Sequence, residues 1–198
     1  MKEVTPVERL IDQLSTLPSI GRKTAQRLAY FILAQPEERA VSLAESIVNA
    51  RKKISFCENC FNYSEREFCD ICENNNRDRS VVMIVESPKD IPVIESTNEF
   101  NGLYHVLHGV ISPLKGISPD DLRIRELINR VGKGEIEEVI IGLDFSVESE
   151  ATTIYISRLL KPLGISITRF ASGIPAGAAL EYADSMTLSQ AIRGRIEI

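Results

Sequence analysis

The chain contains 198 residues, 43% of them hydrophobic and 26% charged, which is typical of a globular protein with one sizeable core or two small domains. Its charged, amphipathic start lacks the apolar stretch of a signal peptide, and no later segment approaches about eighteen unbroken apolar residues. We therefore expect a cytoplasmic protein with no membrane partner. The net charge of −5 argues against a nucleic-acid-binding surface that covers the whole molecule.

The charge is distributed unevenly along the chain. Residues 1–56 contain nine Lys/Arg and six Asp/Glu (net +3), whereas the remaining 142 residues contain fourteen and 22 (net −8). The basic front favours nucleic-acid binding by that part alone, although small solvated helices often carry such an excess without binding anything.

Three helices are expected within residues 1–56. Apolar residues recur there at helical spacing in three groups, which are Leu10, Ile11 and Leu14, then Leu28, Ile32 and Leu33, then Val41, Leu43, Ile47 and Val48. The helices should break at LPSIG, residues 17–21, and at Gln35-Pro36, because proline and glycine interrupt helical pattern.

The first break carries a candidate DNA-binding turn. Gly21 ends it, and Arg22, Lys23 and Arg27 open the next helix. A helix start presents unpaired backbone N–H groups and a positive dipole end, and glycine lets a phosphate approach closely. The pattern fits a helix-hairpin-helix that holds the DNA backbone without reading bases, and it also fits an ordinary turn. The basic excess favours DNA.

All four cysteines lie within sixteen residues. Cys57, Cys60, Cys69 and Cys72 form two CxxC pairs separated by eight residues. Cytoplasmic thiols stay reduced, and a segment this short cannot build a hydrophobic core, so it needs a metal ion to fold. Four thiolates leave no open position on a tetrahedral ion, which predicts one structural zinc; a redox CxxC or unliganded thiols are the alternatives.

After a polar linker at residues 73–80, the pattern changes to alternating strands and helices. Apolar runs predict strands at 81–87, 104–109, 139–144 and 165–171. Helical patterns occupy 120–131, 150–163 and a final stretch near 187–193. Nearly continuous apolar strands with helices between them indicate an α/β body with a mostly parallel sheet covered on both faces.

Carboxylates follow two of these strands. Glu86 comes after the first strand and Asp144 ends a later one, with Glu148 and Glu150 close behind. Ligands collect at the carboxyl ends of parallel strands, where such a cluster would bind Mg²⁺ or dock a cationic partner. Glu148 and Glu150 also fit a simpler role at the start of a helix, where negative charge is favourable.

Five segments together resemble one family. The chain is similar to the RecR family of bacterial recombination mediator proteins in LPSIGRKTAQRLA, the four cysteines, VMIVESPKDIPVIEST, YHVLHGVISPLKGISPDDL with VESEAT, and TRFASGIPAGAALEYADSMTL. The resemblance is collinear over nearly the whole chain. It implies a helix-hairpin-helix head at 1–56, a four-cysteine zinc finger at 57–72, a Toprim body at 79–174 and a C-terminal helix and strand tail at 175–198.

The resemblance also implies a function. Members of the family bind DNA, form ring-like homo-oligomers, and act with RecO and RecF to load RecA onto single-stranded DNA, with no established catalysis of their own. The expected protein is thus a non-enzymatic, sequence-independent DNA-binding scaffold of recombinational DNA repair. The alternative is a Mg²⁺-dependent Toprim-type nuclease or topoisomerase-like enzyme.

One stretch departs from the pattern of Toprim enzymes. Glu86 matches their glutamate and Asp144 the first aspartate of their Asp-x-Asp, but Ser146 occupies the second position. The family usually has Asn-Pro-Thr-Val-Glu-Gly-Glu here, whereas this chain has Asp-Phe-Ser-Val-Glu-Ser-Glu at residues 144–150. We therefore expect partner docking or weak Mg²⁺ binding at this cluster, and no phosphoryl transfer.

Overall fold

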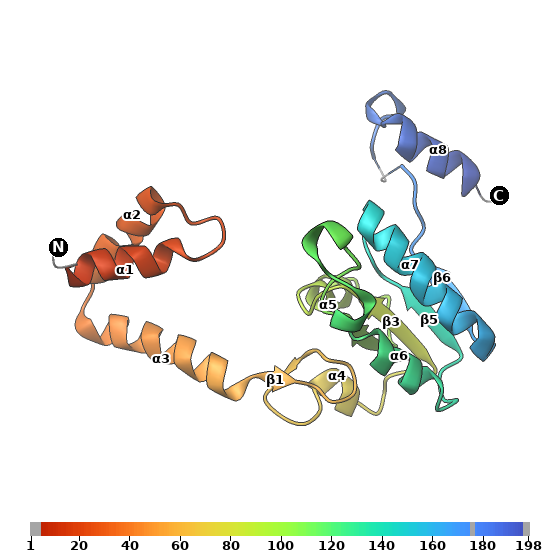
Figure 1. The fold of residues 1–198 in the computed structure, drawn as a ribbon, viewed down its shortest axis with the longest axis horizontal. Helices are drawn as coiled ribbons and strands as arrows, with labels where there is room; N and C mark the ends of the chain where they lie inside the picture. The colour runs from red at the N-terminus through yellow and green to blue at the C-terminus, as the bar shows by residue number, and fades with distance from the viewer. Residues whose placement is uncertain (1–4, 175–176, 196–198) are drawn as a thin grey trace. The chain divides into compact units, whose positions relative to one another are not determined.

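The computed structural model describes residues 5–174 and 177–195. The chain separates into two compact units, Met1–Ile54 and Ser55–Ile198, and each is described by itself. Figure 1 shows their elements in chain order.

The first unit contains the three predicted helices, α1 (Pro6–Ser15), α2 (Arg22–Leu33) and α3 (Glu37–Lys53). Thr5 begins α1 with a capping box, in which its side chain accepts from the Glu8 N–H and Glu8 reaches back to the Thr5 N–H. A small core between α1 and α2 contains Ile11, Ala25 and Ala29. The two alanines lie where the helices meet, and their small side chains let the hairpin close tightly.

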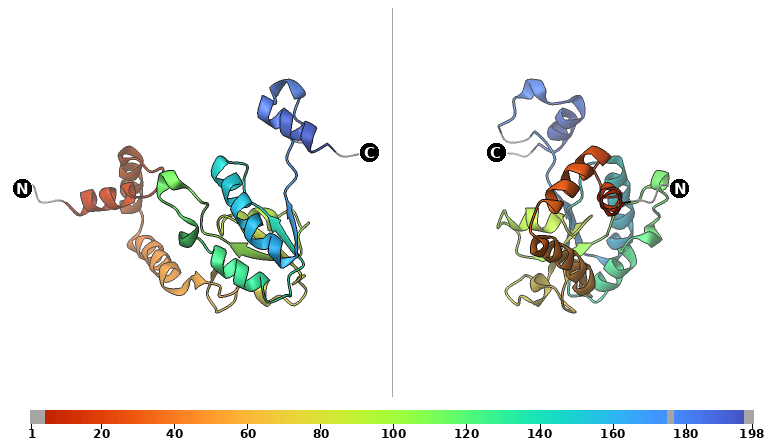
Figure 2. Two further views of the ribbon diagram at one scale, coloured as in Figure 1. Left: turned by 45° about the vertical axis from the view of Figure 1, so that its right-hand side comes forward. Right: turned by 90° about the vertical axis from the view of Figure 1, so that its left-hand side faces the viewer.

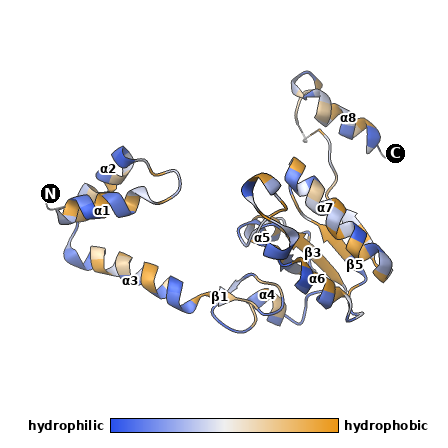
Figure 3. Ribbon diagram, viewed as in Figure 1, coloured by the Kyte–Doolittle hydropathy of each residue, from blue (hydrophilic) through white to orange (hydrophobic). Residues whose placement is uncertain are grey.

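Helix α3 is amphipathic but buries none of its residues. Val41, Leu43, Ile47 and Val48 are 46 to 63% exposed. Figure 3 shows the hydrophobic residues recurring along this helix. The apolar side chains that predicted the helix therefore have no core of their own within a single chain.

The second unit begins with the cysteine segment. Strands β1 (Ser55–Phe56) and β2 (Tyr63–Ser64) pair in antiparallel register, with Phe56 opposite Tyr63. A single helical turn, α4 (Asp70–Glu73), follows and carries the last cysteine.

A four-stranded sheet forms the body. The strands are β3 (Val81–Val85), β4 (Leu103–Val106), β5 (Glu138–Ile141) and β6 (Ser166–Arg169). They pair in the order β4-β3-β5-β6 and all pairs are parallel, as predicted. Each strand ends before its predicted range does, and Glu86 and Asp144 lie in the loops that follow β3 and β5.

Helices cover both faces of this sheet, as Figure 2 shows. Helices α6 (Ile124–Val131) and α7 (Val147–Leu160) pack on the face that contains Val82, Ile84, Val139 and Ile141. Helix α5 (Asp90–Glu95) covers the other face, where Phe61 and Ile71 of the cysteine segment also pack. The finger and the sheet thus share one hydrophobic cluster.

Two helix starts differ from the sequence-based ranges. Helix α7 begins at Val147 because the Ser146 side chain accepts a hydrogen bond from the Ser149 N–H. Helix α6 begins only at Ile124, because a separate 3₁₀ turn at Pro119–Asp121 takes up the first part of the predicted helix. Further 3₁₀ turns lie at Pro113–Lys115, Lys161–Leu163 and Leu180–Tyr182.

The tail contains the predicted final helix, α8 (Ser185–Arg193). It starts two residues earlier than expected because the Asp184 carboxylate accepts from the N–H groups of Met186 and Thr187. Residues 177–195 contain no strand, and the last three residues lie outside the described part of the chain. Among the described residues, no helix combines the length and apolarity needed to cross a bilayer.

Candidate metal centre and nucleic-acid interface

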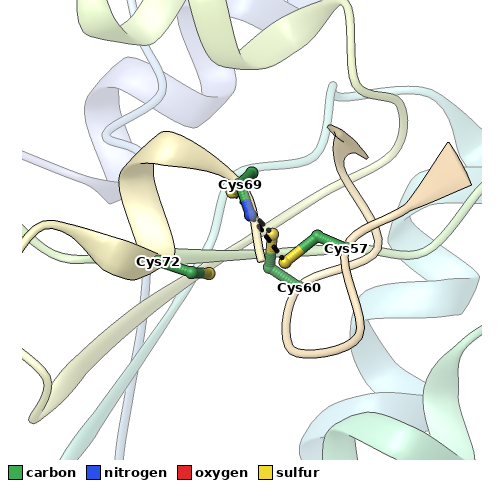
Figure 4. Close-up of side chains that lie close together, drawn as sticks. All are labelled: Cys57, Cys60, Cys69 and Cys72. Carbon is green, nitrogen blue, oxygen red and sulfur yellow. Dashed lines mark hydrogen bonds between the residues drawn. The ribbon is translucent and has the colours of Figure 1, made fainter. Parts of the chain in front are cut away.

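The four cysteines converge on one point, as Figure 4 shows. Their sulfur atoms all lie within 4.8 Å of one another, and all four side chains are buried. The Sγ atoms of Cys60 and Cys69 are 3.5 Å apart, and none of the four cysteines is in a disulfide. Four sulfurs at tetrahedral corners about a zinc ion would be about 3.8 Å apart, given Zn–S bonds of about 2.3 Å. The donor set and spacing fit a closed, structural zinc site.

Hydrogen bonds to sulfur also suit thiolate ligands. The Cys69 N–H donates to the Cys57 Sγ over 3.3 Å, and the Asn59 side-chain amide donates to the Cys72 Sγ over 3.5 Å. Donors that favour the charged sulfur orient it for a metal.

The finger is fixed to the edge of the sheet formed by β4. The Val106 N–H of β4 donates to the Cys60 carbonyl over 2.8 Å, and the His108 Nε2 lies 2.8 Å from the Phe61 carbonyl. Arg130 Nη1 donates both to the Asn59 carbonyl, over 3.3 Å, and to the Tyr104 carbonyl, over 2.7 Å. The finger therefore covers β4, an edge strand that would otherwise present unpaired backbone groups.

Phe61 and His105 complete this junction. The Phe61 ring meets the His105 ring edge-on at 5.4 Å, and the Arg123 guanidinium lies 5.0 Å from the Phe61 centroid. His105 is fully buried, and burial lowers its pKa to about 4. The neutral ring has Nε2 2.7 Å from the Arg123 carbonyl, while Nδ1 has no partner among the described residues.

The predicted DNA-binding residues lie together at the start of α2. Gly21 is the N-cap with ordinary extended backbone angles, and a Cβ added there would meet nothing within 4 Å. Neither strain nor packing therefore requires glycine at this position. Arg22 is paired with Asp12 at 2.7 Å, while Lys23 and Arg27 are exposed.

The predicted acidic residues lie at the carboxyl ends of β3 and β5 and in the first turn of α7. Hydrogen bonds from Ser149, and then from Ser146, hold the pKa of Asp144 below its ordinary range. Glu150 is paired with Arg169 at 2.9 Å, and the Arg169 guanidinium lies 5.1 Å from the Phe145 centroid. Ser146 thus caps α7, both Ser146 and Ser149 bind Asp144, and Arg169 pairs with Glu150.

These carboxylates do not form a metal-sized cluster. Within the described ranges, the cysteines are the only group of three or more candidate ligands that comes within reach of one ion. Glu86 is half-buried at the end of β3, Glu148 is half-buried in α7, and Asp144 and Glu150 are exposed.

The residues that fix the finger and its linker to the body carry no signal in the sequence. Arg77 pairs with Glu95, and Tyr104 donates to the same carboxylate over 2.6 Å. Arg130 joins segments that are 71 residues apart. No local spacing marks such contacts, since each depends on how distant segments pack.

Comparison with known families agrees with this architecture. Family models match in chain order at residues 7–51 (RecR, helix-hairpin-helix), 54–74 (RecR, four-cysteine zinc finger domain), 80–171 (Toprim domain) and 173–196 (RecR, C-terminal). A helical hairpin, a four-cysteine finger and a Toprim body in this order define a modular recombination protein.

Curated relatives assign the particular family. The chain is 50% identical to the recombination protein RecR of Chloroherpeton thalassium, over 97% of each chain. It is 50% identical to that of Carboxydothermus hydrogenoformans, over 96% of each, and 49% identical to that of Heliobacterium modesticaldum, over 98% of this chain and 97% of the relative. The chain belongs to the RecR family.

Proposed function

We propose that this protein is a cytoplasmic, non-enzymatic DNA-binding scaffold of recombinational repair that acts with RecO and RecF to help load RecA onto single-stranded DNA. The observation that carries the proposal is the collinear match to all four family segments, with close relatives that span nearly the whole chain. The finger supports it, because Cys57, Cys60, Cys69 and Cys72 suit one structural zinc ion per chain.

DNA binding is assigned to Gly21, Arg22, Lys23 and Arg27. Gly21 leaves the start of α2 open, and no side chain caps its first N–H groups. A phosphate would meet those N–H groups and the positive end of the helix, with Lys23 and Arg27 nearby. Contacts of this kind hold the backbone and are independent of base sequence.

A double substitution tests this assignment. Replacing Lys23 and Arg27 with alanine should weaken binding to all DNA sequences and make the slope of log affinity against log salt shallower by about two. The matched control is Arg158→Ala with Lys161→Ala, which removes the same charge from exposed positions in the body. Fluorescence anisotropy at several salt concentrations measures both. If the two double variants lost DNA affinity equally, DNA would bind to another part of the protein.

The acidic residues Glu86, Asp144, Glu148 and Glu150 are assigned to docking of a basic partner, with weak Mg²⁺ binding as the lesser role. Asp144 stays ionised because its serine partners favour the carboxylate. Changing Asp144 and Glu148 to alanine should reduce RecO binding while zinc content and bare DNA binding persist. Binding of purified RecO to wild-type and variant protein checks this.

The enzyme alternative has a separate test. Ser146 caps a helix where Toprim enzymes carry an acid, and Glu150 is engaged by Arg169, so the acids are poorly arranged for metal-assisted cleavage. Purified protein incubated with Mg²⁺ and supercoiled DNA should leave it intact. If the wild type cleaved or relaxed the DNA and the Asp144 and Glu148 double variant did not, the protein would be an enzyme and the scaffold proposal would be wrong.

A ring-like homo-oligomer completes the proposal. Helix α3 buries none of its residues, and α8 buries none either. Apolar side chains such as Ile47, Met186 and Ile192 are 63 to 70% exposed. Contiguous exposed apolar surface marks sites of association, and two such faces on one chain suit an assembly that closes on itself.

A further inference from the structure

Arg130 occupies an unusual position at the end of α6. Its Nη1 donates to the Tyr104 carbonyl at the edge of the sheet and to the Asn59 carbonyl inside the first CxxC turn. Both acceptors are neutral, so neither balances the charge of the guanidinium.

No carboxylate forms an ion pair with it either. Seven ion pairs occur in the described part of the chain, and Arg130 takes part in none of them. Burial lowers the pKa of Arg130, whereas the nearby sulfurs of Cys72, Cys60 and Cys57 favour its charged form. A partly buried cation without an ion-pair partner is costly, and the contact with the Asn59 carbonyl places this one beside the CxxC turn that carries Cys57 and Cys60.

The need is mutual. Four thiolates around Zn²⁺ carry a net charge of about −2, and the four cysteines are buried. A buried anionic centre requires nearby cations or hydrogen-bond donors. A cavity of about 460 Å³ beside Cys72 is lined by Arg79, Arg130 and Lys133 and also by Glu73, which pairs with Arg66, and by Glu135.

We propose that Arg130 is the counter-cation of the four-cysteine zinc site and that this pairing fastens the zinc finger to the sheet. The zinc-bound finger then holds the guanidinium between Asn59 and Tyr104. Without zinc, the CxxC turn that presents the Asn59 carbonyl lacks the ion that folds it, and the finger loses its attachment to β4. The inference is independent of DNA binding.

Of the three cations, Arg130 has the geometry for this role. Arg79 also reaches the finger, donating to the Cys72 carbonyl over 3.2 Å, but it is exposed. Lys133 is exposed as well. Water screens charges at such positions, so their effect on the zinc site should be weaker.

The test is a zinc competition assay with a chromophoric chelator. Arg130→Met removes the charge and keeps an apolar stem of similar reach, and it should weaken zinc binding about 10- to 100-fold, the usual effect of losing a residue that supports metal ligands. Arg130→Lys keeps the charge and should retain most of the affinity. Co²⁺ loaded into each variant should give the same tetrahedral tetrathiolate spectrum, since the ligands are unchanged.

Arg125→Met is the matched control. Arg125 lies on the same helix, its side chain is 80% exposed, and its only ion pair is a 3.4 Å contact with Asp120. The Arg125→Met variant should bind zinc with the same affinity as the wild type. Arg79→Met should lose less zinc affinity than Arg130→Met. Equal affinities in the Arg130→Met and Arg125→Met variants would overturn the proposal. So would a Lys variant that binds zinc as weakly as the Met variant.

Wild-type protein provides a second test if Arg130→Met does not fold. The Val106 N–H donates to the Cys60 carbonyl, so its hydrogen exchange reports whether the finger is attached. Chelating zinc should accelerate exchange at Val106 and at the end of α6, while the central strand pair β3 and β5 stays protected. Exchange at Val106 that is unchanged without zinc would contradict the proposal.

Discussion

At the scale of single residues, burial of His105 makes stability depend on pH. Its pKa in the folded state is about 4, against an ordinary value of 6.5, because burial disfavours the imidazolium. Above pH 6.5 the ring is neutral in both states and stability is unaffected. As pH falls from 6.5 to 4, His105 becomes protonated in the unfolded chain but stays neutral in the folded chain. The free energy of unfolding therefore decreases over that range of pH.

The expected loss is about 3 kcal/mol between pH 6.5 and 4, from about 1.4 kcal/mol for each pH unit. Urea unfolding at several pH values measures it. The variant His105→Gln keeps a donor for the Arg123 carbonyl but cannot titrate. Both proteins release zinc at low pH, so subtracting the variant's free energy of unfolding from that of the wild type at each pH leaves the contribution of His105. If the free energies of unfolding of the wild type and the variant changed with pH in parallel, His105 would be protonated in the folded chain without a cost in stability.

Gly21 allows stability and DNA binding to be separated. Serine fits at this N-cap position, since there is space for a Cβ and the backbone is extended, and its hydroxyl would cap α2. Gly21→Ser should therefore raise the free energy of unfolding by a few tenths of a kcal/mol. It should also weaken DNA binding, because the side chain fills the space proposed for a phosphate. Thermal unfolding measures the gain in stability, and fluorescence anisotropy on the same variant measures the loss of DNA affinity. Tighter DNA binding would contradict the proposed contact.

At the scale of elements, the polar segment between finger and sheet is an anchored connection. Arg77 pairs with Glu95 and donates to the carbonyls of Phe100 and Gly102, over 3.2 and 3.5 Å. The Asp78 N–H donates to the Asn101 carbonyl over 2.8 Å. A segment predicted as a linker from its composition is thus held against the loop that precedes β4.

Removing Arg77 should loosen this connection. The side chains of Arg77 and Glu95 are 12% and 29% exposed, so Arg77→Met leaves a largely buried carboxylate without its cation. We expect a loss of about 2–3 kcal/mol in the free energy of unfolding, as for hydrogen bonds to charged groups. Urea unfolding measures it, and a double-mutant cycle with Glu95→Gln isolates the pair. Additive losses in the cycle would show that the two residues act separately.

These elements also show what sequence can predict. Helical spacing located α1, α2 and α3, and apolar runs located all four strands, because both follow from local periodicity. The cysteine spacing predicted their convergence for the same reason. The contacts of Arg130 and Arg77 follow from packing between segments 18 to 71 residues apart, and local pattern cannot reveal them.

At the scale of the whole molecule, the chain divides its charge and its apolar surface between two units. The basic helical unit carries the residues proposed for DNA, and the acidic unit carries those proposed for a basic partner. The four parallel strands and their helices provide the second unit with a two-faced core. The helical unit has only the small α1–α2 core, and the apolar face of α3 remains uncovered. Association of chains would cover that face, which ties stability of the first unit to assembly.

This link yields a prediction for the oligomer. Ile47 is 63% exposed in the middle of α3, and Ile47→Glu places a charge on its apolar face. At a fixed protein concentration the variant should have a lower mass by light scattering than the wild type, because burying an unpaired carboxylate in a contact between chains is costly. Leu114→Glu is the control: Leu114 is 97% exposed but lies in the 3₁₀ turn Pro113–Lys115 and not on an α-helix. If both variants keep the wild-type mass while circular dichroism shows them folded, α3 is not a contact between chains, and the assembly must use the face of α8 or another surface.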